Sequence, residues 1–175
     1  MNRIFSIVFI AVLLCSCSKN VITDPKQTNS GSQISRAQAI STIDLKLGKN
    51  VKAKIKDEEV DFSQRQFKRY IQQYLGKFDL YDQSNSTGVV VEVTITHMRV
   101  RSYLASAALS YGSGPDFMRG TVVVKNAQGN LLSQFEVNVV YGKSGIFSGG
   151  QEKRLLWLKR AFSQQIALQL SGNND

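Results

Sequence analysis

Between residues 41 and 170, apolar residues recur with two different periods, and this change of period restricts the fold more than any other feature of the sequence. In several segments every second residue is apolar, which is typical of half-buried strands. In two other segments the apolar residues stand three or four positions apart, as on one face of a helix. The order of the segments predicts a two-layer α+β domain, in which two amphipathic helices pack on one face of a mainly antiparallel sheet.

The first strand-like segment comprises residues 43–47, and the same alternation continues over residues 51–55. The turn-like Gly48-Lys49-Asn50 separates the two segments, so we expect either a hairpin or one bent strand there. A further short strand is expected over residues 78–81.

The second half of the sheet is predicted from longer segments. We expect one strand over residues 89–101 and a hairpin made of strands over residues 121–124 and 131–141. Gly129 can take the positive φ that the hairpin turn needs. The strand residues expected to face the core are Val89, Val91, Val93, Ile95, Phe135, Val137, Val139 and Tyr141.

Two helices are expected. Ser63 and Gln66 have the spacing of a capping box at the start of the first, and Gly76 is expected just beyond its end. The second helix is expected over residues 151–170. The apolar faces comprise Phe67, Tyr70, Ile71, Tyr74 and Leu75 in the first helix and Leu155, Leu158, Phe162, Ile166 and Leu170 in the second.

The amino-terminal residues have the pattern of a secretory signal peptide. Arg3 is the only charged residue before residue 17, and residues 4–14 are apolar except for Ser6. A positive start, a short apolar run and small residues are typical of such peptides. A run of about 11 residues is too short to cross roughly 30 Å of hydrocarbon, so residues 1–16 are predicted to be removed rather than to span a membrane.

The apolar run ends in Leu14-Cys15-Ser16-Cys17, which resembles the lipobox of bacterial lipoproteins. The resemblance implies that Cys17 becomes the first residue of the mature chain and carries acyl chains such as palmitate. Modification of Cys15 would need a small residue in place of Leu14, which favours Cys17. The alternative is a plain signal peptide with two incidental cysteines. Ser18, the residue after Cys17, resembles the sorting signal of outer-membrane lipoproteins, which implies a domain that faces the periplasm. Retention in the inner membrane and exposure at the cell surface stay open.

The composition of residues 17–175 predicts a tether, one folded domain and a short tail. Residues 17–40 are rich in Ser, Asn, Gln and Thr and are expected to form a flexible tether; residues 41–171 form one periplasmic domain and residues 172–175 a disordered tail. Without residues 1–16 the chain keeps 21 basic and 13 acidic residues, a net charge of +8. This charge suggests an anionic glycan or lipid partner or simply a solvated surface, whereas the predicted compartment argues against nucleic acid.

No catalytic or cofactor motif is recognisable, so we expect no enzyme activity, no cofactor and no metal. Gly142-Lys143-Ser144 lacks the preceding glycine of a phosphate-binding loop, because that position is Val137. His97 is the only histidine, and without further His or Cys ligands a zinc site is not expected. We expect His97 to be a strand residue near the sheet edge.

Trp157 is the candidate interaction residue, because the helical spacing places it with Leu168 on the side opposite the apolar stripe. Lys153 and Arg160 lie close to it, and a tryptophan between cations suits contact with a partner or a lipid headgroup. The alternative is that residues 144–150 or 103–109 fold over Trp157 and bury it.

With these elements in place, residues 89–170 resemble small Gram-negative outer-membrane lipoproteins of an uncharacterised family. The resemblance lies in a long strand, a glycine-containing segment, the hairpin with Asn126-Ala127-Gln128-Gly129, a second glycine segment and a terminal helix. The order of elements is more distantly similar to lipoproteins that assist lipopolysaccharide assembly or activate peptidoglycan synthases, which implies a non-catalytic accessory role.

The sequence therefore predicts a lipid-anchored accessory protein of the cell envelope, whose domain binds another envelope component. The second hypothesis is a binder of anionic glycan or lipid, such as peptidoglycan or lipopolysaccharide. The third is an envelope hydrolase, which would need a deep pocket with two carboxylates or His97 beside a serine. The oligomeric state stays open.

Overall fold

The structure is a computed structural model that describes residues 22–23, 39–57, 60–85, 87–101, 114–142 and 150–172. Its elements are β1 (Ile22–Thr23), β2 (Ile40–Leu47), α1 (Lys49–Asp57), α2 (Gln64–Gly76), β3 (Val89–Arg99), β4 (Asp116–Lys125), β5 (Leu131–Tyr141) and α4 (Gln151–Ser171). The predicted signal peptide, Cys17 and most of the predicted tether lie outside the described residues.

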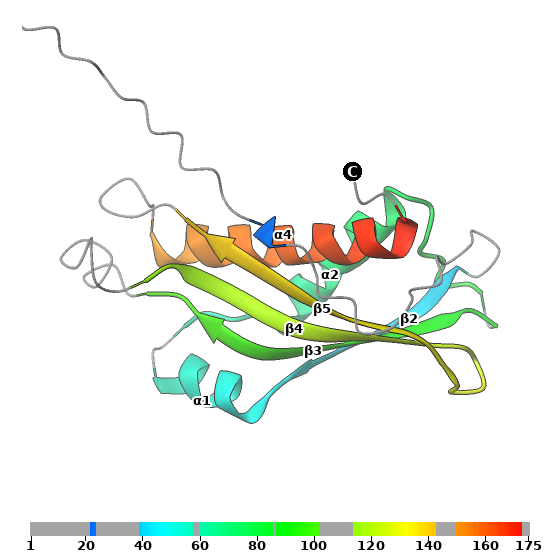
Figure 1. Ribbon diagram of the computed structural model, residues 1–175, viewed down its shortest axis with the longest axis horizontal. Coiled ribbons are helices and arrows are strands. Elements are labelled where there is room, and N and C mark those ends of the chain that lie inside the picture. Colours follow the sequence, from blue (N-terminus) through cyan, green and yellow to red (C-terminus); the bar gives the residue numbers. More distant parts are fainter. Residues whose placement is uncertain are drawn as a thin grey trace, which may run out of the picture.

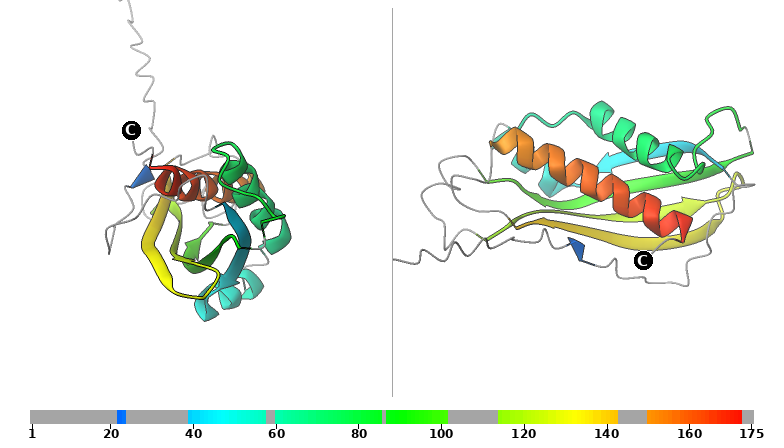
Figure 2. Two further views of the ribbon diagram at one scale, coloured as in Figure 1. Left: turned by 90° about the vertical axis from the view of Figure 1, so that its right-hand side faces the viewer. Right: turned by 90° about the horizontal axis from the view of Figure 1, so that it is seen from above.

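The predicted α+β architecture is confirmed. The strands form one twisted sheet in the order β1-β5-β4-β3-β2, and α2 and α4 lie side by side on one face (Figures 1 and 2). All neighbouring strands are antiparallel except β2 and β3. These two run parallel because the chain between them carries α1 and α2 and returns to the same end of the sheet.

The core lies between the sheet and the two helices, as the apolar periods predict. Every residue expected to face the core from β3 and β5 is buried, and so are the five residues of the α4 stripe. Gly120 of β4 lets α4 approach closely, because a Cβ there would lie 2.9 Å from the Phe162 ring and 2.6 Å from the Thr94 carbonyl oxygen. The close approach of helix and strand therefore depends on the missing side chain.

α2 begins at the predicted cap but lacks half of the predicted capping box. The Ser63 hydroxyl accepts a hydrogen bond from the Gln66 backbone N–H at 3.2 Å. The Gln66 side chain instead accepts from Lys159 of α4 at 3.2 Å. The prediction for Gly76 is also wrong in detail: it is the last helical residue, and the left-handed residue that follows is Asp79, with φ of 56°.

The prediction of a strand over residues 51–55 is wrong, because these residues lie in α1. Val51 and Ile55 are four positions apart, which suits one face of a helix as well as alternate positions of a strand. Val51 is buried whereas Ala53 is exposed, so the helical spacing decides the local structure. α1 lies on the opposite side of the sheet from α2 and α4 (Figure 1).

The expected strand over residues 78–81 is also absent. Residues 77–79 form a turn, and only Tyr81 makes an isolated parallel bridge, to Ile40. This segment is the connection from α2 back to the sheet. Its single bridge closes the connection against the start of β2.

β1 lies within the segment predicted to be a tether. Ile22 pairs with Val139 and Thr23 with Asn138, so the two residues extend the sheet beyond β5. Among the helices that the structure describes, none is long and apolar enough to cross a membrane.

Candidate functional site

Trp157 packs against the end of β5. Its ring is 5.2 Å from that of Tyr141 in an edge-to-face arrangement, and its side chain stays half-buried. The two segments that sequence analysis considered as covers, residues 103–109 and 144–150, lie outside the described residues except for Gly150. Trp157 thus combines a packed ring with partial exposure.

The three residues expected near Trp157 differ in their burial and contacts. Lys153 is exposed and Leu168 is half-buried. The Arg160 guanidinium lies 5.4 Å from the ring centre of Tyr70 in α2, so Arg160 faces the other helix. The four residues therefore do not form one compact cluster among the described contacts.

A buried ionic triad joins the amino-terminal end of α4 to the sheet, and sequence analysis missed it. Asp116 Oδ1 lies 2.9 Å from Arg101 Nε and also accepts the Arg101 backbone N–H at 2.9 Å. Asp116 Oδ2 lies 2.6 Å from Arg154 Nε, and the Arg154 guanidinium donates to the Arg101 carbonyl oxygen. Asp116 and Arg154 are fully buried.

The triad explains why a cation is tolerated close to the start of α4, where the helix dipole disfavours positive charge. The Asp116 carboxylate offsets that charge and ties the helix to both ends of the β3–β4 connection. Tyr141 lies in register with Asp116. Burial raises the pKa of the Tyr141 phenol, an effect that the Arg154 charge opposes and the Asp116 charge reinforces. These contacts hold elements together and offer no open reactive group.

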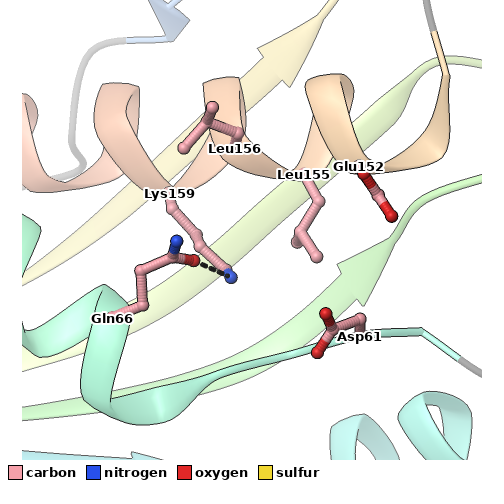
Figure 3. Close-up of a pocket in the computed structure, with 6 residues that line it drawn as sticks. All are labelled: Asp61, Gln66, Glu152, Leu155, Leu156 and Lys159. Carbon is pink, nitrogen blue, oxygen red and sulfur yellow. Dashed lines mark hydrogen bonds between the residues drawn. The ribbon is translucent and has the colours of Figure 1, made fainter.

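A pocket of about 190 Å³ lies between α2 and α4, around Lys159 (Figure 3). Lys159 is 2% exposed, donates to Gln66 Oε1 at 3.2 Å and lies 4.8 Å from the ring centre of Phe62. Burial lowers the pKa of the Lys159 amine, and the charge of Asp61 partly opposes this shift. The remaining lining residues are Glu152, Leu155 and Leu156.

The Lys159 pocket brings two carboxylates together, which bears on the hydrolase hypothesis. Asp61 and Glu152 are both exposed, and the pocket is smaller than the roughly 300–1,000 Å³ of ordinary ligand sites. Glycoside hydrolases place their paired carboxylates on either side of the bond that is cleaved, with access for the attacking water. His97 is exposed on β3 opposite Arg119, with no serine in its register. The geometry therefore favours a structural role for this pocket.

Replacing Lys159 with methionine is expected to flatten the alkaline pH dependence of stability. The folded chain releases the Lys159 proton at lower pH than the unfolded chain, whose lysine pKa is near 10.5. Between these two pKa values the unfolded state binds more protons at this residue, so Lys159 contributes a rise of the free energy of unfolding with pH. Urea unfolding measured between pH 7 and pH 10.5 should show this rise reduced in Lys159→Met.

The matched control is Lys153→Met, which removes an exposed lysine from the same helix. We expect it to keep the wild-type rise. Identical pH profiles for Lys159→Met and the wild type would contradict the buried placement of the amine.

A larger pocket, of about 320 Å³, lies on the face of the sheet opposite α2 and α4. We call it the sheet-face pocket. Two rows of paired residues cross β3, β4 and β5 there: Arg99, Phe117 and Val140 in one row, and His97, Arg119 and Asn138 in the other. The residues that line the pocket are Arg99, Gly114, Pro115, Phe117, Arg119, Asn138 and Val140.

The Arg99 side chain is fixed at the rim of this pocket. Its Nε and Nη2 donate to the Pro115 carbonyl oxygen at 3.1 Å and 2.8 Å, and its guanidinium lies 5.8 Å from the Phe117 ring centre. Gly114 has φ of 60°, and a Cβ there would lie 2.4 Å from Arg99 Nη2. The missing side chain of Gly114 therefore leaves room for the Arg99 guanidinium.

Metal binding finds no support in the described ranges, where no three His, Cys, Asp or Glu side chains are grouped. Lys143 and Ser144 of the Gly-Lys-Ser sequence, and residues 112–113 of the other glycine segment, fall outside those ranges.

Comparison with known proteins identifies a shared fold. No protein-family model and no curated protein matches the chain. A point variant of PelC from Paraburkholderia phytofirmans, solved as a dodecamer, is 12% identical with a TM-score of 0.52 over 84% of this chain and 93% of that chain. A second PelC dodecamer gives 10% identity and a TM-score of 0.52, with 82% and 96% covered.

A minor lipoprotein from Acinetobacter baumannii is 15% identical over 76% of this chain and 91% of that chain, with a TM-score of 0.36. At these identities, the comparison establishes that the chain shares its fold with PelC, and it carries no residue of a site across.

Proposed function

We propose that this chain is a lipid-anchored accessory protein of the cell envelope, whose domain acts by binding another envelope component rather than by catalysis. The observation that carries the proposal is the junction of the apolar run with Leu14-Cys15-Ser16-Cys17, upstream of a folded α+β domain. Acyl chains on Cys17 would hold the domain at a bilayer, because each buried methylene contributes about 0.8 kcal/mol.

The contacts of the ionisable residues support a binding role. Asp116 and Arg154 pair with each other inside the buried triad. Lys159 contacts Gln66 and the Phe62 ring, so all three charged side chains make structural contacts. These residues stabilise the packing of α4 on α2 and the sheet. The outer side of α4 is the contact surface that we propose, because Trp157 remains partly exposed there with Lys153 one turn away.

PelC assembles as a dodecamer, which makes a second copy of this chain one of the partners that we propose. Self-association and binding to a different envelope protein would both place α4 against another chain. The two cases differ in the mass of the covalent adduct that a crosslinker on α4 produces.

A photo-crosslinking residue at position 153, in the full-length chain in growing cells, tests the proposal. We expect a discrete adduct whose partner mass spectrometry identifies as an envelope protein or a second copy. The same residue at position 56 in α1, on the other side of the sheet, is the control and should not capture that partner. Absence of a reproducible adduct at position 153 would contradict the proposed contact surface.

A further inference from the structure

α1, which lies on the side of the sheet opposite α2 and α4, is a basic helix. The acidic residue of α1 is Asp57, and its exposed cations are Lys49, Lys52, Lys54 and Lys56. Figure 1 places α1 opposite α2 and α4, and the sheet-face pocket opens on that same side. Lysines of a helix and arginines of a pocket therefore lie on one side of the domain, where their fields add.

The sheet-face pocket presents cations to a ligand. Arg119 is exposed and has no acidic partner among the described side chains. His97 is exposed beside it in the strand register, and the Arg99 guanidinium at the rim is held by the Pro115 carbonyl oxygen. Guanidinium groups in this arrangement suit a phosphate, whose oxygens accept hydrogen bonds from the fork of an arginine.

The pocket also offers a hydrogen-bond acceptor and an apolar wall. Asn138 Oδ1 is buried and has no donor among the described residues, although a buried amide oxygen is normally paired. It lines the pocket together with Phe117 and Val140. A ligand that carries a hydroxyl group close to its phosphate would satisfy this oxygen while the arginines bind the charge.

The position of β1 relates this pocket to the predicted anchor, and this step rests on the proposed function. Thr23 lies in register with Asn138 at the edge of the sheet. Thr23 lies six positions after Cys17, and an extended chain of that length spans at most about 20 Å. A lipid on Cys17 would therefore keep the pocket within reach of the bilayer surface.

We propose that the sheet-face pocket and the lysines of α1 bind the headgroup of an anionic phospholipid, of the phosphatidylglycerol class, in the bilayer that holds the anchor. The phosphate would lie at Arg119 and Arg99, and the glycerol hydroxyls at Asn138. The pocket of about 320 Å³ is within the usual range for small ligand groups. Binding would orient the domain with α1 toward the membrane and α4 away from it.

Vesicle binding tests this orientation directly. The chain from residue 17 to residue 175, carrying Cys17→Ser so that no acyl chain contributes, is sedimented with phosphatidylcholine vesicles that contain or lack phosphatidylglycerol. We expect binding only with phosphatidylglycerol. Arg119→Gln should weaken it about fivefold, the effect of one basic residue at an anionic surface. The matched control Arg65→Gln, on α2, should change it less than twofold.

Lys52→Gln combined with Lys56→Gln should also weaken binding, so the result does not depend on the folding of one variant. Equal effects of Arg119→Gln and Arg65→Gln, or equal binding to both kinds of vesicle, would overturn the proposal. Stronger binding to vesicles containing lipopolysaccharide would overturn the choice of phospholipid. If vesicle binding fails while the adduct at position 153 persists, this inference is wrong and the proposed function stands.

Discussion

Replacing Asp116 with alanine is expected to lower the free energy of unfolding by about 3–5 kcal/mol, because two buried guanidinium groups would lose the carboxylate between them. Asp116 lies 2.9 Å from Arg101 Nε and 2.6 Å from Arg154 Nε. Water does not reach either partner of the second pair, since both side chains are fully buried. Domains have a total stability of about 5–15 kcal/mol, so urea unfolding followed by circular dichroism should detect the loss easily.

Asp44→Ala is the matched control for this prediction. It removes a carboxylate from an ion pair of similar length, 2.9 Å from Asp44 to Lys46, in which the two side chains are 46% and 58% exposed. Water compensates exposed charges after such a change, so we expect the midpoint to move little. Comparable losses in Asp116→Ala and Asp44→Ala would show that the triad does not stabilise the fold.

Replacing Cys17 with serine is expected to abolish acylation of the chain. The predicted lipid attachment needs the Cys17 thiol, and serine offers only a hydroxyl of similar size. Cells fed a clickable palmitate analogue should label the wild-type band and leave the Cys17→Ser band unlabelled. The variant should also lose most of its membrane attachment, because each lost methylene removes about 0.8 kcal/mol of transfer free energy.

Cys15→Ser is the control, because both cysteines precede the described domain and only Ser16 lies between them. The variant should retain the label. Loss of the label in Cys15→Ser with retention in Cys17→Ser would show that Cys15 is the modified residue. If neither the wild type nor Cys15→Ser is labelled, the chain is not acylated and the amino-terminal residues are a plain signal peptide.

Sequence analysis predicted correctly those elements whose apolar residues fit only one type of secondary structure. The α4 stripe from Leu155 to Leu170 has only a helical interpretation, and the alternation from Val89 to Ile95 has only a strand interpretation. Residues 51–55 fit both, since Val51 and Ile55 share a face in either structure. Packing beside β3 then selected the helix, which local sequence does not reveal.

The sites were missed because they depend on contacts between distant segments. Arg154 and Asp116 are separated by 38 positions, and nothing in the neighbourhood of either residue indicates that both are buried. The sheet-face pocket takes Arg99, Phe117 and Asn138 from three strands, whose juxtaposition follows from the register. Charged residues are usually exposed, so a sequence gives no reason to place these arginines in a buried triad or at a pocket.

The mass of the amino-terminal peptide of the native protein tests the central claim most directly. The claim predicts that this peptide, from protein purified from membranes, begins at Cys17 and carries the mass of a diacylglyceryl group, with or without a further acyl chain. A peptide that begins at Met1 with an unmodified thiol would contradict it. The proposed envelope location and the inference about the bilayer would then both be withdrawn.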